Sequence, residues 1–415
     1  MSYVGKIKKY SRKAATTFKN EGFLAVSIKA LTKLQKKQAQ TTDNPILKKK
    51  FNSLVDRKNV MFADWSGHQY VKKEAKAKSQ YTINWIMSPP AGGGGHQNIF
   101  RFIEFLDKLG HKNNVYLYST FDDTTLEQAK KNVLAYCRAK NLDFYYFKGT
   151  MVPSDIVFAT GWETAYPVFN LKTSAQKMYF IQDFEPLFYP MGTDYVLAEN
   201  TYKFGFFGIT AGGWLSDKLS REYGMRCDNY DFGADLDIYK LLNTGERKEI
   251  FFYARPVTER RGFDLGVMAL EIFHKKMPEY TINMAGWDVS EWDVPFPYIN
   301  HGSVVIEELP ALYSRSAAAL VISLTNMSLL PLELLATGTI PVVNAGPNNS
   351  KVSNNKYIHY TEPSPEALAD ALIEVITRPD LREYSEKASK TVPQGGWSEA
   401  KEKFIEILEG EFTHG

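Results

Sequence analysis

Three arginines, Arg255, Arg260 and Arg261, lie close together in the sequence. They follow a strand-length apolar run, Glu249–Tyr253, and precede a helical pattern. Three guanidinium groups at a strand-to-helix turn repel one another unless an anion neutralises them, and a diphosphate can accept paired hydrogen bonds from a guanidinium. The sequence therefore predicts a diphosphate site at this turn. A solvated charged loop is the alternative interpretation.

Glu333 is a carboxylate placed near the start of an otherwise apolar helix pattern, 328–336. Apolar runs of strand length at 317–323 and 340–343 flank this helix, so the stretch is typical of a βαβ unit. In such units ligands gather at the carboxyl ends of strands, where free helix amides attract anions. A carboxylate there can accept hydroxyl hydrogen bonds, so we expect Glu333 to hold a sugar whose phosphate lies nearby.

A glycine-rich turn stands near the start of the first apolar strand series. The strand pattern 81–87 runs into four glycines, 92–95, and then into His96 and an amphipathic helix pattern. Glycine lets a ligand approach the backbone closely, so Gly94 and Gly95 are predicted to line a donor site. The spacing matches neither a Walker A motif nor a dinucleotide fingerprint. We expect a lowered pKa for His96 and contact with a sugar; an exposed helix residue is the alternative.

Polar residues also follow the strand pattern 178–181, at Gln182, Asp183 and Glu185. In parallel sheets the chemistry lies at the carboxyl ends of the strands. Asp183 and Glu185 are therefore candidates for a base or for carboxylates that orient acceptor hydroxyls. The alternative for each carboxylate is a cap on the following turn.

These features are distributed along two series of alternating strands and helices, which predicts an α/β protein with two parallel sheets. The first series has strand patterns at 81–87, 114–118, 156–160, 178–181 and 206–210, and the loop 229–235 is expected to leave it. The second begins at Glu249–Tyr253 and continues at 280–285, 298–306, 317–323 and 340–343. The expected parts are a basic helical extension (1–75), an acceptor-side domain (76–236), a nucleotide-sugar domain (237–394) and a last helix (395–415) that returns to the first domain.

Composition and short motifs indicate the cellular compartment of this chain and whether it binds a metal ion. Of its 415 residues 44% are hydrophobic and 23% charged, and it has two cysteines, Cys137 and Cys227. This predicts neither a disulfide framework nor a zinc site, and a reducing cytoplasm is expected. No apolar run approaches the roughly 20 residues of a membrane span, and no signal peptide opens the sequence. No Asp-x-Asp pair at a strand end suits Mg²⁺, so neither metal nor cofactor is expected.

Charge is distributed unevenly along the chain. Residues 1–50 carry thirteen basic and two acidic side chains, whereas the whole chain has a net charge of +3. One interpretation is an amphipathic helix that rests on the anionic inner face of a membrane or on an anionic lipid-linked acceptor. The other is a solvated helix packed on the first domain. Nucleic acid is not expected as a partner, because no binding module accompanies the basic residues.

Together these features resemble the retaining GT-B glycosyltransferases of family 4, in which two Rossmann-like domains face each other across a cleft. The strongest match is LLPLELLATGTIPVV at 329–343, which is similar to the start of the family's signature helix, with Glu333 as the second glutamate of E-x7-E. The resemblance implies that Glu333 holds the donor ribose. It also implies that the amides of Ser328, Leu329 and Leu330 hold the phosphates.

The same resemblance assigns the arginines. Arg255 matches the arginine of the family's R-x4-K diphosphate clamp. Arg260 falls on the lysine position by spacing, while Arg261 directly precedes a glycine, and both are candidates. Other strand ends of the second series, at Gly286 and Val305, are expected to contact the donor nucleotide, with ordinary packing as the alternative.

Two departures from the family pattern concern the transferred sugar. Thr325 replaces the first glutamate of E-x7-E, and Gln182 stands where the family often has a histidine. A 6-deoxysugar would explain the lost carboxylate, and YFIQDFEPLFYP at 179–190 is similar to bacterial rhamnosyltransferases. The resemblance thus implies dTDP-β-L-rhamnose as donor and a growing lipid-linked rhamnan of a surface glycan as acceptor.

The implied reaction is metal-independent transfer with retention, for which Arg255, Gln182 and Asp183 are the candidate catalytic residues. Either the departing phosphate or Asp183 takes the acceptor proton, and the sequence leaves both routes open. A UDP- or GDP-sugar transferase and a non-catalytic GT-B binding protein are the alternatives. An NAD-dependent oxidoreductase would need a dinucleotide fingerprint, which is absent from the sequence.

Overall fold

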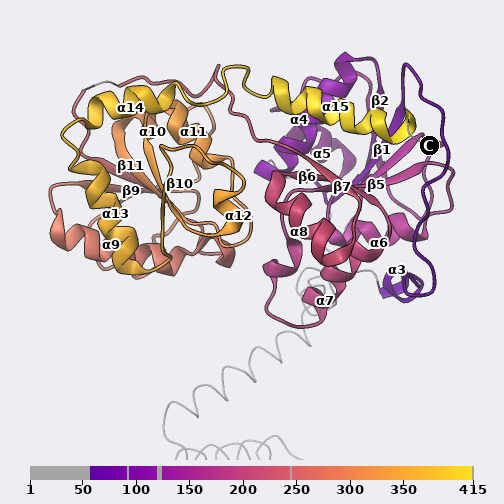
Figure 1. Ribbon diagram of the computed structural model, residues 1–415, viewed down its shortest axis with the longest axis horizontal. Helices are drawn as coiled ribbons and strands as arrows, with labels where there is room; N and C mark the ends of the chain where they lie inside the picture. Colours follow the sequence, from indigo (N-terminus) through magenta and orange to yellow (C-terminus); the bar gives the residue numbers. More distant parts are fainter. Residues whose placement is uncertain (1–56, 91–92, 119–123, 244, 414–415) are drawn as a thin grey trace, which may run out of the picture. The chain divides into compact units, whose positions relative to one another are not determined.

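The computed structural model describes residues 57–90, 93–118, 124–243 and 245–413 (Figure 1). The described residues from Asn59 onward form one compact unit. The basic segment 1–50 and its expected amphipathic helix lie outside the described residues. Helix α3 (Arg57–Met61) opens the described chain. No described helix has both the length and the apolar character that a bilayer span requires.

The first sheet has seven parallel strands in the order β3-β2-β1-β4-β5-β6-β7. Its strands are β1 (Thr82–Met87), β2 (Lys112–Leu117), β3 (Leu142–Tyr146), β4 (Ile156–Ala159), β5 (Gln176–Ile181), β6 (Phe207–Ala211) and β7 (Cys227–Tyr230). The central strands β4 and β5 are buried along their whole length. This burial explains why β4 and the last four residues of β5 are continuous apolar runs and not alternating patterns.

Helices from both ends of the described chain complete the first lobe, a name used here for this sheet and the elements packed on it. They are α4 (Gly94–Lys108), α5 (Leu126–Leu134), α6 (Trp162–Asn170), η1 (Glu185–Phe188), α7 (Thr193–Asn200), η2 (Thr201–Lys203), α8 (Gly213–Tyr223) and α15 (Ser398–Thr413). Phe404 and Phe412 of α15 belong to the same core cluster as the strands, and the ring of Phe412 lies 4.7 Å from that of Tyr81. Figure 1 shows α15 (yellow) beside α4. The last helix therefore packs on the first sheet.

The second lobe is built on six parallel strands in the order β10-β9-β8-β11-β12-β13. The strands are β8 (Glu249–Tyr253), β9 (Thr281–Ala285), β10 (Ile299–Gly302), β11 (Ser316–Val321), β12 (Ile340–Asn344) and β13 (His359–Thr361). Its helices are η3 (Glu259–Arg261), α9 (Phe263–Lys276), α10 (Leu309–Arg315), α11 (Leu330–Ala336), α12 (Pro347–Ser350), α13 (Pro365–Ile376) and α14 (Leu381–Ser389). Helix α9 packs closely on β8, because a Cβ at Gly266 would fall 2.2 Å from Cζ of Phe252.

The predicted α/β class with two parallel sheets is confirmed, but several local predictions were wrong or missing. The loop expected at 229–235 starts inside β7, an edge strand that is largely polar and only partly buried. Strand β3 was missed for the same reason, since its residues are half-buried or exposed. Helices α13 and α14 were also missed. A strand at the edge of a sheet buries little surface, so it leaves a weak apolar signal in the sequence.

Candidate functional site

The carboxyl end of β5 brings Asp183 against the second lobe. Its Oδ1 accepts a hydrogen bond from the backbone amide of Phe184 at 2.8 Å. Its Oδ2 accepts one from the hydroxyl of Thr325, also at 2.8 Å. Burial raises the pKa of Asp183, while Arg261 and Arg260 lower it. Asp183 is thus a buried carboxyl group with a hydroxyl donor and positive charge beside it.

The structure brings the three predicted arginines together after β8. Arg261 donates a hydrogen bond to Oγ of Ser323 at 2.6 Å. Burial lowers the pKa of Arg261; Asp183 raises it, and the neighbouring Arg260 and Arg255 lower it. The mutual repulsion that the sequence predicted is therefore present. An anion bound among the three groups would relieve it.

Arg255 follows β8, and its side chain reaches the end of the neighbouring strand β9. Its Nη1 donates to the carbonyl of Gly286 at 3.1 Å, and its guanidinium lies 5.6 Å from the ring centroid of Trp287. Gly286 has a φ of 119°, which favours glycine, and its amide donates to Gly302 at 2.8 Å. Val305 follows β10 and is 57% exposed, so its contact with a nucleotide base remains a prediction.

The start of α11 offers backbone donors. Within the described residues, no hydrogen bond uses the backbone amides of Ser328, Leu329 or Leu330. Leu329 also packs against the core cluster of the first lobe. The amides expected to hold phosphates are therefore unpaired in the part of the chain that the structure describes, as the first turn of a helix requires.

Glu333 lies in the first turn of α11, and the hydroxyl of Tyr239 donates to it. Burial raises the pKa of Glu333 to about 7; Asp235 also raises it and Arg101 lowers it. Arg101 of α4 forms an ion pair with Asp235, with 2.6 Å between Nη2 and Oδ2. Glu333, the carboxylate expected to hold a sugar, thus belongs to a charged group with Arg101 and Asp235, and Asp235 lies in the segment that links the two lobes. Sequence reasoning missed Arg101 and Asp235, because each lies far from Glu333 along the chain.

The glycine-rich turn is held by Gln182. Nε2 of Gln182 donates to the carbonyl of Gly95 at 3.1 Å, and its Oε1 accepts from Asn98 at 3.0 Å. Gly94 and Gly95 form the exposed first turn of α4. His96 lies 3.1 Å from the carbonyl of Ser88, and burial lowers its pKa. The pKa direction agrees with the prediction, although the cause is burial and not the helix terminus.

Glu185 is buried, and its hydrogen-bond donors come from the first lobe. Its Oε2 accepts from the backbone amide of Trp162 at 2.5 Å and from the hydroxyl of Tyr179 at 3.1 Å. Burial raises the pKa of Glu185 to about 8, and the nearby Glu163 also raises it. Glu185 thus caps the start of α6, which precedes it in the chain, and not the following turn that the alternative named. Its contact with an acceptor stays a prediction.

One further residue joins the two lobes. The side-chain amide of Asn326 donates to the carbonyls of Gln182 at 2.9 Å and Ala211 at 3.1 Å, at the ends of β5 and β6. Sequence reasoning missed Asn326, although its position in a polar loop after a buried strand was the available signal. The loop before α11 is thus fixed to the first lobe.

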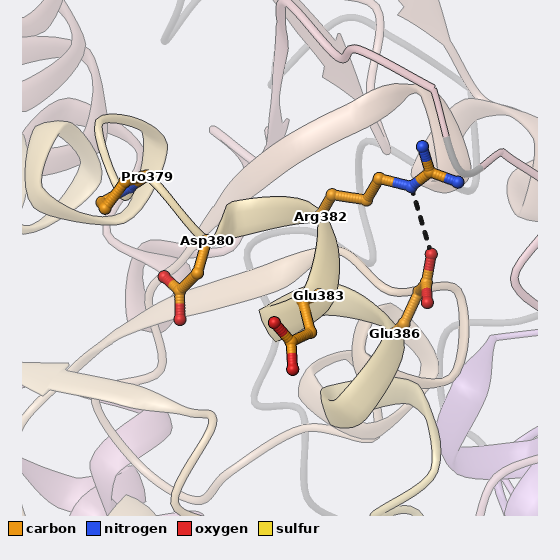
Figure 2. Close-up of a pocket in the computed structure, with 5 residues that line it drawn as sticks. All are labelled: Pro379, Asp380, Arg382, Glu383 and Glu386. Atoms are coloured by element: carbon orange, nitrogen blue, oxygen red, sulfur yellow. Dashed lines mark hydrogen bonds and ion pairs between the residues drawn. The ribbon is translucent and has the colours of Figure 1, made fainter.

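A surface hollow of about 410 Å³ lies elsewhere, along α14. Figure 2 shows its lining, Pro379, Asp380, Arg382, Glu383 and Glu386, with an ion pair of 3.3 Å between Arg382 and Glu386. None of the predicted site residues lines this hollow. The converging charges at the ends of β5, β8 and β11 define the candidate site better than this hollow does.

Comparisons with known proteins give a family and a fold. Residues 108–210 match the family model for the N-terminal domain of WsaF, and residues 248–373 match that for its C-terminal domain. The O-antigen biosynthesis protein RfbC of Myxococcus xanthus is 30% identical over 262 residues, which are 61% of this chain and 20% of that protein. The chain therefore spans about a fifth of the length of this curated relative.

Two solved structures show the similarity of fold. Sucrose-phosphate synthase of Thermosynechococcus elongatus superposes with a TM-score of 0.62 at 14% identity, over 80% of this chain and 100% of that one. HepE of Anabaena in complex with UDP-glucose superposes with a TM-score of 0.60 at 13% identity, with the same coverage of 80% and 100%. The fold is that of the GT-B glycosyltransferases.

Proposed function

Because this chain is a glycosyltransferase of the WsaF family, we propose that it transfers L-rhamnose from dTDP-β-L-rhamnose, with retention, to the end of a growing lipid-linked rhamnan of a bacterial surface glycan. The observation that carries the proposal is the group of Arg255, Arg260 and Arg261, which contacts the loop leading to α11, whose first amides have no partner among the described residues. Such donors suit a nucleoside diphosphate as leaving group. The role of the Myxococcus relative in O-antigen biosynthesis supports a polysaccharide acceptor.

The residues present would carry the transfer by stabilising charge. Negative charge develops on the diphosphate as the bond to the sugar breaks, and fixed guanidinium and amide donors stabilise it without reorganisation. Arg255 and Arg260 would supply the positive charge that a metal ion supplies in other transferases. The acceptor proton passes to the departing phosphate or to Asp183. An unchanged rate in EDTA is the expected result for metal-independent transfer.

The pair formed by Thr325 and Asp183 supports a deoxysugar as the transferred group. In related enzymes a glutamate at position 325 is expected to contact a sugar hydroxyl, whereas here the Thr325 hydroxyl already donates to Asp183 at 2.8 Å. Thr325 is shorter than glutamate, and its hydroxyl is already bound to Asp183. It therefore leaves room for the methyl group of a deoxysugar but offers no free partner to a sugar hydroxyl at the same place.

The test is direct transfer. The protein would be incubated with a rhamnose-terminated acceptor and dTDP-β-L-rhamnose, UDP-glucose or GDP-mannose, and the product read by mass and anomeric coupling. Transfer from dTDP-rhamnose with retention supports the proposal. Transfer from UDP-glucose would favour the alternative that UDP-glucose-bound HepE suggests. Binding of dTDP without transfer from any donor would indicate a non-catalytic binding protein.

Contact with the inner membrane surface is proposed for the basic residues 1–50, on their net charge alone. Flotation with vesicles rich in anionic lipid, at low and at high salt, tests this contact. Binding that is lost at high salt supports it, because surface electrostatics are screened by ions. Protein that stays unbound at low salt contradicts it.

A further inference from the structure

Arg260 belongs to the second lobe, but its side chain contacts the first. Its Nε lies 3.6 Å from Oδ2 of Asp183, and its Cζ lies 4.1 Å from the ring centroid of Phe188. Phe188 ends the turn η1, which begins two residues after Asp183. A carboxylate and an aromatic face from one short segment therefore hold this guanidinium.

The hydrogen bonding of Arg260 is incomplete. Its Nε is buried and has no hydrogen-bond partner within the described residues, because 3.6 Å to Asp183 is an ion-pair distance and not a hydrogen bond. By contrast, Arg261 donates to Ser323 at 2.6 Å and Arg255 donates to Gly286 at 3.1 Å. Arg261 and Arg255 thus have hydrogen-bond partners in their own lobe.

We propose that Asp183 is an internal competitor of the donor diphosphate for Arg260, so that donor binding transfers Arg260 from Asp183 to phosphate and leaves the carboxylate free to act on the acceptor. The inference rests on the proposed function, since it takes Arg260 as part of the diphosphate clamp. Phe188 is the positioning residue, because a ring that stacks on the guanidinium face leaves the N–H edges free to exchange partners.

The exchange has a consequence for the order of events. Asp183 keeps the Thr325 hydroxyl and the Phe184 amide as donors after Arg260 has left it. It loses a nearby positive charge, and a carboxylate without that charge holds a proton more strongly. Asp183 therefore becomes a better proton acceptor only when the diphosphate is in place. The acceptor hydroxyl is activated after the donor has bound.

Asp183→Asn tests the competition. Asparagine keeps an oxygen for the Thr325 hydroxyl but removes the charge that holds Arg260. We expect this variant to bind dTDP about threefold to tenfold more tightly than the wild type in calorimetric titration, while its turnover falls. Affinity that is unchanged or weaker overturns the proposal. Asp217→Asn is the matched control, because Asp217 also pairs across the lobes, with Lys351 at 3.2 Å, but lies outside the arginine group.

Two further variants separate this inference from the proposed function. Arg260→Ala should weaken dTDP binding, and in that background Asp183→Asn should no longer tighten it. If Arg260→Ala leaves the affinity for dTDP unchanged, the phosphate site itself is wrong. If it weakens binding while Asp183→Asn has no effect on the intact clamp, only the competition fails. Phe188→Leu should weaken dTDP binding about threefold, and Phe188→Tyr should restore it.

Discussion

The hydroxyl of Thr325 donates a hydrogen bond to Oδ2 of Asp183 at 2.8 Å, and this contact joins the loop before α11 to the end of β5. The first glutamate of the family signature is absent at position 325, but a carboxylate reaches the same place from the other lobe. The side chain that would contact the transferred sugar and the arginines that would hold its diphosphate thus belong to different sheets.

Replacement of Thr325 by valine tests how much the Thr325–Asp183 hydrogen bond contributes to catalysis. Valine has the same shape but no hydroxyl, so Asp183 would lose a buried donor, a loss of about 1–2 kcal/mol. We expect kcat to fall roughly tenfold. The affinity for dTDP should stay close to that of the wild type. Thr325→Ser keeps the donor and should retain most of the activity; equal losses in both variants would contradict the role of the hydroxyl.

Arg255→Ala should remove most of the turnover. A lost charge-assisted contact in a water-poor site costs on the order of 3 kcal/mol, which is roughly a hundredfold in kcat/KM. The fold should survive, because the one hydrogen bond that the Arg255 side chain forms within the described residues goes to the carbonyl of Gly286. Steady-state kinetics measure the loss of turnover, and circular dichroism shows whether the variant is folded. Arg255→Lys should have an intermediate kcat/KM. Wild-type rates for Arg255→Ala would contradict the role of Arg255 in a diphosphate clamp.

Glu333 predicts a pH dependence of nucleotide binding. Its pKa is raised to about 7, first by burial, so the carboxylate that we propose accepts the 3′-hydroxyl of the dTDP pentose forms as pH rises through 7. Affinity for dTDP should therefore increase from pH 6 to pH 8. The terminal phosphate titrates near 6 as well, so the contribution of Glu333 is the difference between wild type and Glu333→Gln. Parallel profiles for the two proteins would count against Glu333.

The same carboxyl group has the opposite effect on stability. Because its folded pKa lies above the ordinary value of 4.5, its contribution to the free energy of unfolding is complete at low pH and is lost as pH rises through about 7. Glu333→Gln should therefore gain stability over the wild type at pH 8 and gain little at pH 4. Urea unfolding at the two values measures the difference.

Two glycines in helices predict opposite changes in stability. A Cβ at Gly266 of α9 would meet Phe252 at 2.2 Å, so Gly266→Ala should destabilise the protein by about 2 kcal/mol or more. A Cβ at Gly410 of α15 meets nothing within 4 Å, so Gly410→Ala should stabilise it by up to about 1 kcal/mol. Thermal unfolding of both variants compares them; destabilisation by Gly410→Ala would contradict the packing described for α15.

Buried strands and their polar ends could be predicted from the sequence, because β5, β8 and β11 are apolar runs that stop at charged or hydroxyl side chains. The placement of Asp183, Arg260 and Arg261 just after strands followed from the alternating pattern, but their approach across the two lobes was not predicted. The residues around Glu333 could not be predicted in this way. Arg101 and Asp235 lie in a helix and a linker whose meeting depends on tertiary packing, and no local periodicity encodes it. Edge strands such as β7 were missed because they bury too little apolar surface to leave a pattern.

The position of α15 has a consequence for how the protein forms during synthesis. Phe404 and Phe412 complete the core around β1, yet they are made after the whole second sheet. A ribosome releases the N-terminal strands first, so the part of their apolar face that α15 covers stays uncovered until α15 has been made. The second lobe, whose core lies within one continuous stretch, can close earlier. We therefore expect the first lobe to complete its core only after the second lobe has been synthesised.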